Sequence, residues 1–502
     1  MSLSTEKKIG QRIAREIYRD PDYIDDPLIS AYVQRIWQPL LAAAKRRGDI
    51  SPEQEQLAWE IMIGKDRSIN AFALPGGYFG LHLGLVGAVA TRDELASVLA
   101  HELTHVSQRH IARQISNQNQ QTPWLLGAMI LGALAAGKNP QAANAVLAGS
   151  QAVGVQTQLN FSRDMEREAD RIGFSILQEA GMDVRGFTGM FDKLQNANRI
   201  NDNGSFPYLR SHPLTSERLG DMQSRLQLIP AASLTTSSLG WQAEHAIVAT
   251  RARLLADSSV DSLRSELVQA GLALRNPLPA NSASALKIRQ LAQLYGGAFA
   301  SHRQRDAATA LRYAAAARET LVSMPFSDQK ESIAGIEYAR AAIELIVIES
   351  ALAAPSPSVE AQQAATTALE VLRKSSTLSS ERPTLLAWAQ LARRAPNLDR
   401  PAAINALQIW VANRAGDAPA WEALASLYEA EGQTLRSMRA RAESFVALLD
   451  YGAALDRLKA AQEWMRANPA GAGSHIEASI IDTRTRAVQA TVRELQNERD
   501  RP

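Results

Sequence analysis

The sequence contains no cysteine among its 502 residues. This absence excludes disulfide bonds and thiolate metal ligands, so any metal site must be built from histidine and carboxylate side chains. It does not fix the cellular compartment, because cysteine-free proteins occur in both oxidising and reducing environments.

Excess charge and long apolar runs are also lacking. The formal net charge is only +2, which gives no reason to expect nucleic acid as a partner. The longest apolar run, residues 124–136, is too short to span a bilayer, so we expect no transmembrane segment. No signal peptide is visible, which leaves two interpretations: a cytoplasmic protein, or a secreted protein that has lost its signal.

Histidine is scarce, with 8 in the chain, yet two of them lie four positions apart in the segment His101–His105, His-Glu-Leu-Thr-His. On an α-helix such side chains lie about 40° apart around the axis, so both imidazoles can reach one metal ion. Glu102 lies where it can deprotonate a metal-bound water, as in the H-E-x-x-H motif of zinc proteases. Thr91 and Glu94 form a capping box that predicts a helix here and argues against a chance pair of surface histidines.

A catalytic zinc site needs three protein ligands and one open position, so a third ligand must be found. The metzincin motif would place glycine at 108 and histidine at 111, where this chain has Gln108 and Ile111. His110 lies about 140° around the helix from His105, so we expect it to point elsewhere. The third ligand should therefore come from a second helix.

A stretch without acidic residues, 106–163, ends in a cluster of four: Asp164, Glu166, Glu168 and Asp170. Glu166 and Asp170 share a helix face with Ala169 and Gly173, whose small size would let two helices approach closely. Glu168 lies about 200° from Glu166 and is expected to point away. We predict Glu166 as the third ligand and Asp170 as a hydrogen-bond acceptor for a zinc histidine. The alternative is a solvated acidic face paired with neighbouring arginines.

Three segments, residues 70–77, 94–102 and 162–171, resemble metallopeptidase family 48. The family's H-E-x-x-H and E-x-x-A-D motifs imply that His101, His105 and Glu166 hold zinc and that Glu102 is the catalytic base. A His-Pro pair and a downstream arginine of the family are matched here by His212 and Arg218. The resemblance covers about residues 5–225. A C-terminal tetratricopeptide-like region, described below, makes the BepA/YfgC-type periplasmic proteases of this family the most similar in architecture. HtpX-like members have transmembrane helices, which we do not expect here, so that branch is disfavoured.

The chain around these motifs predicts an α+β fold. Residues 57–63, 69–74 and 78–82 read as strands of a small antiparallel sheet, and we place the strand 78–82 at an edge where an extended peptide could pair. Two short apolar helices are expected within 124–158. We therefore expect a gluzincin-type zinc metalloprotease domain over residues 1–232, mostly helical with this small sheet.

Small polar residues follow this domain, and the remainder of the chain is expected to be entirely helical. Residues 421–428 match the beginning of a tetratricopeptide repeat, and weaker matches lie near 291–325 and 451–469. We predict a tetratricopeptide-like solenoid over residues 240–502. An irregular helical bundle is the alternative.

The functional hypothesis is a zinc-dependent endopeptidase in which Glu102 activates a zinc-bound water. His212 or Arg218 could stabilise the oxyanion, or His212 could instead fill the open position on zinc and keep the enzyme latent. An ordinary histidine with no role in the site is the third alternative for His212. The resemblance implies a periplasmic location, misfolded outer-membrane proteins as substrates and an outer-membrane assembly machine as a partner. The rival hypothesis is a repeat-based chaperone or adaptor whose zinc centre is latent or structural.

Overall fold

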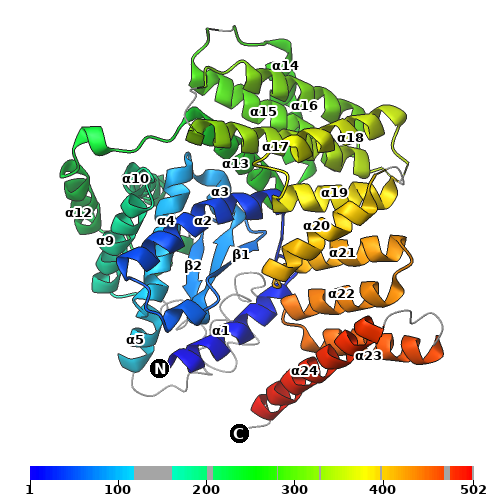
Figure 1. The fold of residues 1–502 in the computed structure, drawn as a ribbon. Coiled ribbons are helices and arrows are strands. Elements are labelled where there is room, and N and C mark those ends of the chain that lie inside the picture. Colours follow the sequence, from blue (N-terminus) through cyan, green and yellow to red (C-terminus); the bar gives the residue numbers. More distant parts are fainter. Residues whose placement is uncertain are drawn as a thin grey trace. The chain divides into compact units, whose positions relative to one another are not determined.

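The computed structural model describes residues 1–117, 161–200, 207–279, 281–326, 330–354, 356–395, 398–468 and 475–499. The apolar helices predicted within 124–158 lie outside these residues. The chain divides into two compact units, Met1–Ile343 and Glu344–Pro502. Each unit is described by itself (Figure 1).

The first unit contains a three-stranded sheet, drawn in light blue in Figure 1. Its strands are β1 (Glu60–Gly64), β2 (Ala71–Leu74) and β3 (Tyr78–His82), in the order β1-β3-β2. The existence of all three strands was predicted correctly, but the placement of Tyr78–His82 at an edge is wrong. The expectation of an antiparallel sheet is also wrong, because the sheet is mixed. The short turn Pro75–Gly77 folds β3 back against β2 as an antiparallel hairpin, and the free side of β3 then pairs with β1 in parallel.

Large aromatic side chains hold the sheet against helix α2 (Pro27–Arg47). Trp37 on α2 packs edge-on against Phe79 of β3, with 4.7 Å between the ring centroids. The indole nitrogen of Trp37 donates to the carbonyl of Trp59 at 2.9 Å, so the polar edge of this buried ring is also satisfied. The contact fixes α2 to the central strand.

The motif residues lie on helix α4 (Arg92–Ser107), which is buried along nearly its whole length. One half of the predicted capping box is present, because the Thr91 hydroxyl accepts from the Glu94 amide at 3.1 Å. The Glu94 carboxylate accepts from the amide of Ala90, one residue before the cap, at 2.6 Å. Helix α4 packs against β2, against α10 (Arg185–Ile200) and most extensively against α9 (Arg163–Glu179).

The close contact between α4 and α9 depends on a glycine. A Cβ atom at Gly173 would lie 3.1 Å from the backbone of Ala100, tighter than ordinary van der Waals contact. Ala169 on the same face of α9 is fully buried. The prediction that small residues bring the second helix close to the motif helix is therefore confirmed.

The first unit continues through a series of helices: α1 (Leu3–Tyr18), α3 (Leu83–Ala88), α5 (His110–Asn117), α11 (Pro207–Ser211), α12 (Ser216–Gln227), α13 (Leu239–Ala256), α14 (Val260–Arg275), α15 (Ser284–Arg303) and α16 (Ala307–Val322). Helix α17 (Lys330–Leu352) follows and spans the division between the units. The boundary expected near 232–240 falls in a mostly exposed segment between α12 and α13. The contacts nevertheless group α13–α16 with the first unit, and the expected domain boundary stays a prediction.

The second unit contains helices only in its described residues. They are α18 (Val359–Lys374), α19 (Arg382–Arg394), α20 (Arg400–Asn413), α21 (Ala418–Ala430), α22 (Thr434–Ala447), α23 (Tyr451–Ala467) and α24 (His475–Arg499). From α19 onward each helix packs against a helix that follows it, as repeats of helix pairs do. The repeat-like segment 421–428 lies on α21, and Gly432, with φ +69°, makes the turn into α22.

The small sheet, the helical first unit and the helical second unit confirm the α+β fold class. Among the described residues, no helix combines the length and the apolar character that crossing a bilayer requires.

Candidate metal centre

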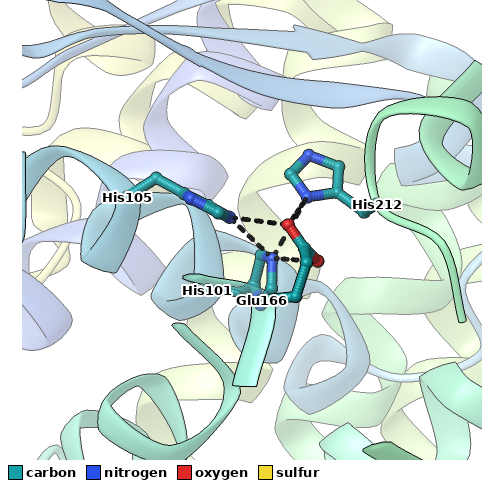
Figure 2. Close-up of side chains that lie close together, drawn as sticks. All are labelled: His101, His105, Glu166 and His212. Atoms are coloured by element: carbon teal, nitrogen blue, oxygen red, sulfur yellow. Dashed lines mark hydrogen bonds and ion pairs between the residues drawn. The ribbon is translucent and has the colours of Figure 1, made fainter. Parts of the chain in front are cut away.

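Helices α4 and α9 bring the predicted ligands together. The Nε2 atoms of His101 and His105 lie 3.0 Å apart, because the two residues are one turn apart on α4. Glu166, on the first turn of α9, places one carboxylate oxygen 3.6 Å from the Nε2 of His101 and the other 3.5 Å from the Nε2 of His105. Figure 2 shows the three side chains pointing toward one another.

His212 completes the cluster from a third segment, directly after α11. Its Nδ1 atom lies 3.0 Å from Glu166 Oε1 and 3.3 Å from His101 Nε2 (Figure 2). The four ligand atoms all lie within 4.8 Å of one another. All four residues are buried, with at most 2% of any of them exposed. Residues far apart in the sequence therefore converge on one point.

The cluster fits a divalent cation. Bonds of about 2.0 Å in a tetrahedral zinc site separate the ligand atoms by about 3.3 Å. The separations given above, from 3.0 to 3.6 Å, bracket that value. Two imidazoles and a carboxylate are also the ligand types of catalytic zinc sites.

Glu102 lies beside the cluster on α4. Its Oε1 is 3.4 Å from His212 Nε2, and neither carboxylate oxygen makes a hydrogen bond of normal geometry to a described residue. Burial raises the pKa of Glu102, although the nearby His212 and His101 partly oppose the shift. An acceptor with raised basicity and open lone pairs is suited to take up a proton.

Asp170 is placed as the sequence predicted, one turn after Glu166. Its Oδ1 lies 2.9 Å from His101 Nδ1, on the side of the ring opposite the cluster. Burial alone would raise the pKa of Asp170, but hydrogen bonds from Arg218 and His101 lower it. The aspartate is therefore a charged acceptor for the Nδ1–H of His101, and this leaves Nε2 of the ring free for a metal.

Arg218, near the beginning of α12, contacts two carboxylates of the site. Its Nε and Nη2 donate to Asp170 at 2.6 and 2.8 Å, and its Nη1 lies 2.8 Å from Glu166 Oε2. The guanidinium group is buried, so these contacts compensate for two buried negative charges. Arg218, a candidate for oxyanion stabilisation in the sequence, therefore directs its guanidinium donors at the carboxylates of Asp170 and Glu166.

Two neighbouring residues, His110 and Glu168, lie outside the cluster but contact each other beside it. His110 is not among the cluster's ligand atoms, but it lies on the far side of His105, where the Nδ1 atoms of the two rings are 2.9 Å apart. Glu168 does not contact the cluster, and its Oε2 lies 3.1 Å from His110 Nε2. The contact between His110 and His105 was not anticipated, because α4 ends at Ser107 and the helical angle counted from His105 no longer applies at position 110.

Two aromatic residues of the site were missed. Phe161 stacks on His105 with 3.8 Å between ring centroids, and Tyr208 stacks on His212 at 4.6 Å. Burial, followed by the charge of Glu102, raises the pKa of Tyr208 well above its usual value, so the phenol stays protonated. The sequence offered one signal for both aromatic residues. Phe161 directly precedes the cap of the helix that carries Glu166, and Tyr208 lies four positions before His212.

Comparison with known proteins points to one family. Residues 27–226 match the sequence profile of Peptidase family M48. The beta-barrel assembly-enhancing protease of Escherichia coli (strain K12) is 32% identical over 229 residues, 45% of this chain and 44% of the relative. The protein of the same name from Yersinia pestis is 32% identical over 225 residues, with the same coverage of 45% and 44%.

More distant relatives carry a different name. Mitochondrial metalloendopeptidase OMA1 of Saccharomyces cerevisiae is 27% identical over 235 residues, 45% of this chain and 65% of the relative. The chain spans about half the length of the first curated relatives that it matches. The similarity therefore bears on part of each protein.

Proposed function

We propose that this chain is a zinc-dependent endopeptidase, because residues 27–226 match the sequence profile of Peptidase family M48. His101, His105 and Glu166 would hold the metal, with Glu102 as the general base. The observation that carries the proposal is the convergence of these buried donors, within 4.8 Å of one another, beside a glutamate of raised pKa.

When bound, zinc would supply Lewis-acid activation of a water and of the scissile carbonyl. Glu102 would accept the proton of the attacking water on its carboxylate and return it to the nitrogen of the leaving amine. The raised pKa of Glu102 favours this role, because the carboxyl group must hold the proton between the two transfers. Burial of the whole cluster keeps bulk water from competing for that proton.

Asp170 and Arg218 would position the ligands. Asp170 fixes His101 with Nδ1 protonated, and Arg218 holds the carboxylates of Asp170 and Glu166 through one guanidinium group. We propose this positioning role for Arg218 in place of oxyanion stabilisation, because its donors already face two carboxylates. Loss of such a partner typically costs a metal site about 10- to 100-fold in affinity.

We propose that His212 is a fourth ligand in a latent resting state. Its Nδ1 lies among the other three donors, 3.0 Å from Glu166. A substrate would have to displace it to reach the open coordination position. Stabilisation of an oxyanion by Nε2, which lies on the Glu102 side of the ring, is the competing role.

For the substrate we propose an extended segment of a misassembled outer-membrane protein, as the name of the bacterial relatives suggests. Strand β2 is an edge of the sheet within the described residues and packs against α4. The amide of His82 donates to the carbonyl of Asn70, so the pairing alternates and Ala71 and Ala73 direct their backbone groups away from β3. A substrate strand could pair there.

For the remainder of the chain we propose a tetratricopeptide-like domain over residues 240–502, following a protease domain over 1–232. It would bind unfolded clients or an assembly machine at the outer membrane. A periplasmic location follows from that client class, with the cytoplasm as the alternative.

The deciding experiment measures two quantities on the same protein. We would determine bound zinc per chain and the degradation of an unfolded outer-membrane β-barrel protein, for the wild type and for Glu102→Gln. A matched control is Glu179→Gln, which alters an exposed carboxylate at the end of α9. We expect both variants to bind one zinc and only Glu102→Gln to lose cleavage. If all three proteins bind zinc and none cleaves any substrate, the adaptor hypothesis replaces this proposal.

A further inference from the structure

The chain turns sharply just past the second metal-binding histidine. Helix α4 ends at Ser107, and Arg109 adopts φ +54°, in the left-handed region that non-glycine residues seldom enter. Arg109 is held there by an ion pair with the buried Glu6 and by a hydrogen bond to the carbonyl of Met1 at 2.6 Å. The next residue, His110, begins α5 and is completely buried.

This turn brings His110 back against the far side of His105. The two Nδ1 atoms are 2.9 Å apart, so one ring must donate and the other must accept. The Nε2 of His105 faces the metal cluster. A ring that binds metal through Nε2 carries its proton on Nδ1, so His105 is the donor and His110 the acceptor.

The acceptor role of His110 Nδ1 also determines what the other nitrogen of this ring does. With its Nδ1 unprotonated, neutral His110 carries its only proton on Nε2, which lies 3.1 Å from Glu168 Oε2. The same oxygen accepts from Arg113 Nη1 at 2.9 Å. Glu168 Oε2 therefore accepts from both His110 and Arg113. Every donor therefore meets an acceptor.

We infer that His110, oriented by Glu168, is a positioning residue for the metal ligand His105. The pair would fix His105 with Nδ1 protonated and Nε2 directed at the metal. Asp170 with Arg218 makes the corresponding contact to His101. The inference rests on the proposed metal site, and it adds an outer partner for the second histidine, on which the family motif carries no information.

The test replaces His110 with two residues of similar size. His110→Asn keeps an amide oxygen that can accept the Nδ1–H of His105, whereas His110→Leu removes the acceptor. Glu168→Leu removes the group that orients His110, and Glu179→Leu on the same helix is the matched control. The zinc dissociation constant is measured by competition with a chelator, and thermal unfolding of the metal-free proteins shows whether each variant folds. The visible spectrum of the cobalt-substituted protein reports the geometry of the ligands.

We expect His110→Leu to weaken zinc binding about 10-fold or more and to change the cobalt spectrum. His110→Asn should stay within about 3-fold of the wild type, Glu168→Leu should fall between the two, and the control should match the wild type. Equal losses for the Asn and Leu variants would mean that His110 only fills space, and wild-type affinity in a folded Leu variant would overturn the inference. A wild-type protein that binds no zinc would refute the proposed metal site itself, and this inference with it.

Discussion

Among single residues, His245 shows how buried partners fix the state of an ionisable group. Its Nε2 lies 3.0 Å from the carbonyl of Val89, so this nitrogen must donate. Its Nδ1 lies 2.6 Å from the Tyr32 hydroxyl, from which it accepts. Both contacts are satisfied by a neutral ring, and burial lowers the pKa of His245 to about 4.

This neutral histidine predicts an acid sensitivity of the fold. In the unfolded chain His245 binds a proton below its ordinary pKa of 6.5, whereas in the folded chain it binds one only below about pH 4. The contribution to stability is therefore complete above pH 6.5 and is lost as the pH falls to 4, by about 3 kcal/mol at 1.36 kcal/mol per pKa unit. Urea unfolding of wild type and His245→Gln should show a free-energy difference that changes over this range. Parallel curves would contradict the prediction.

A second prediction at this scale concerns His212. If it occupies the open coordination position at rest, His212→Ala should raise kcat/KM for an unfolded substrate several-fold, because substrate no longer competes with the ring. The measurement is the initial cleavage rate at substrate concentrations well below KM, with the exposed His475→Ala as control. A fall in rate with zinc binding intact would assign His212 to the oxyanion.

The sequence predicted the candidate ligands and the Asp170 partner of His101, but not the His110 partner of His105, for a physical reason. The spacing of His101 and His105 is a local property of one helix, and Glu166 with Asp170 repeats that spacing on another. The position of His110 depends on the left-handed backbone conformation of Arg109. A sequence predicts such a conformation mainly where it has a glycine, and this position has none. A contact that depends on such a turn cannot be read from helical periodicity.

Among the elements, the packing of α9 on α4 sets the distance between ligands. Gly173→Ala places a Cβ 3.1 Å from the backbone of Ala100, so the helices must separate by a few tenths of an ångström. We expect a loss of about 1–3 kcal/mol in unfolding free energy and weaker zinc binding, because Glu166 moves with α9.

The control for this substitution is Gly220→Ala on α12, where a Cβ would meet nothing within 4 Å. Alanine there should stabilise the protein by about 0.5–1 kcal/mol, as expected for a helix interior. Thermal unfolding and chelator competition measure both effects. If the two variants behave alike, close packing at Gly173 does not set the geometry of the site.

The sheet shows where prediction from local pattern ends. Strand composition and the Pro75–Gly77 turn identified each strand, because both are properties of short segments. The order β1-β3-β2 depends on which strand is central. That is determined by pairing between segments that are not adjacent in the sequence, which local patterns do not report. The edge strand that we propose for substrate pairing is consequently β2, and not Tyr78–His82 as the sequence predicted.

Across the first unit, α13 is joined to the segment before α4 by buried polar contacts. Arg251 donates to both carboxylate oxygens of Asp26 and to the Tyr295 hydroxyl. Glu244 pairs with Arg35. The contacts with Asp26 and Arg35 cross the expected domain boundary, so α13, which directly follows it, helps to stabilise the unit that contains the proposed metal centre.

Removing one of these charges should therefore destabilise the whole unit. Arg251→Leu leaves Asp26 buried without its main partner, which typically costs about 3–5 kcal/mol. The control Arg253→Leu alters an arginine two positions away whose side chain is 52% exposed, so it should cost well under that amount. Urea unfolding followed by fluorescence and by zinc release measures both. Equal, small effects would mean that α13 is an independent module.

The Asp26–Arg251 pair also limits how evolution or an engineer can recombine this chain. A chimera joined between residues 233 and 238 would look reasonable from sequence, because that stretch is polar and mostly exposed. Such a chimera would nevertheless replace α13, and with it Arg251, so the buried Asp26 would lose its guanidinium partner. A chimera that keeps this ion pair must be joined after α13, or its incoming helix must supply an arginine at the position of Arg251.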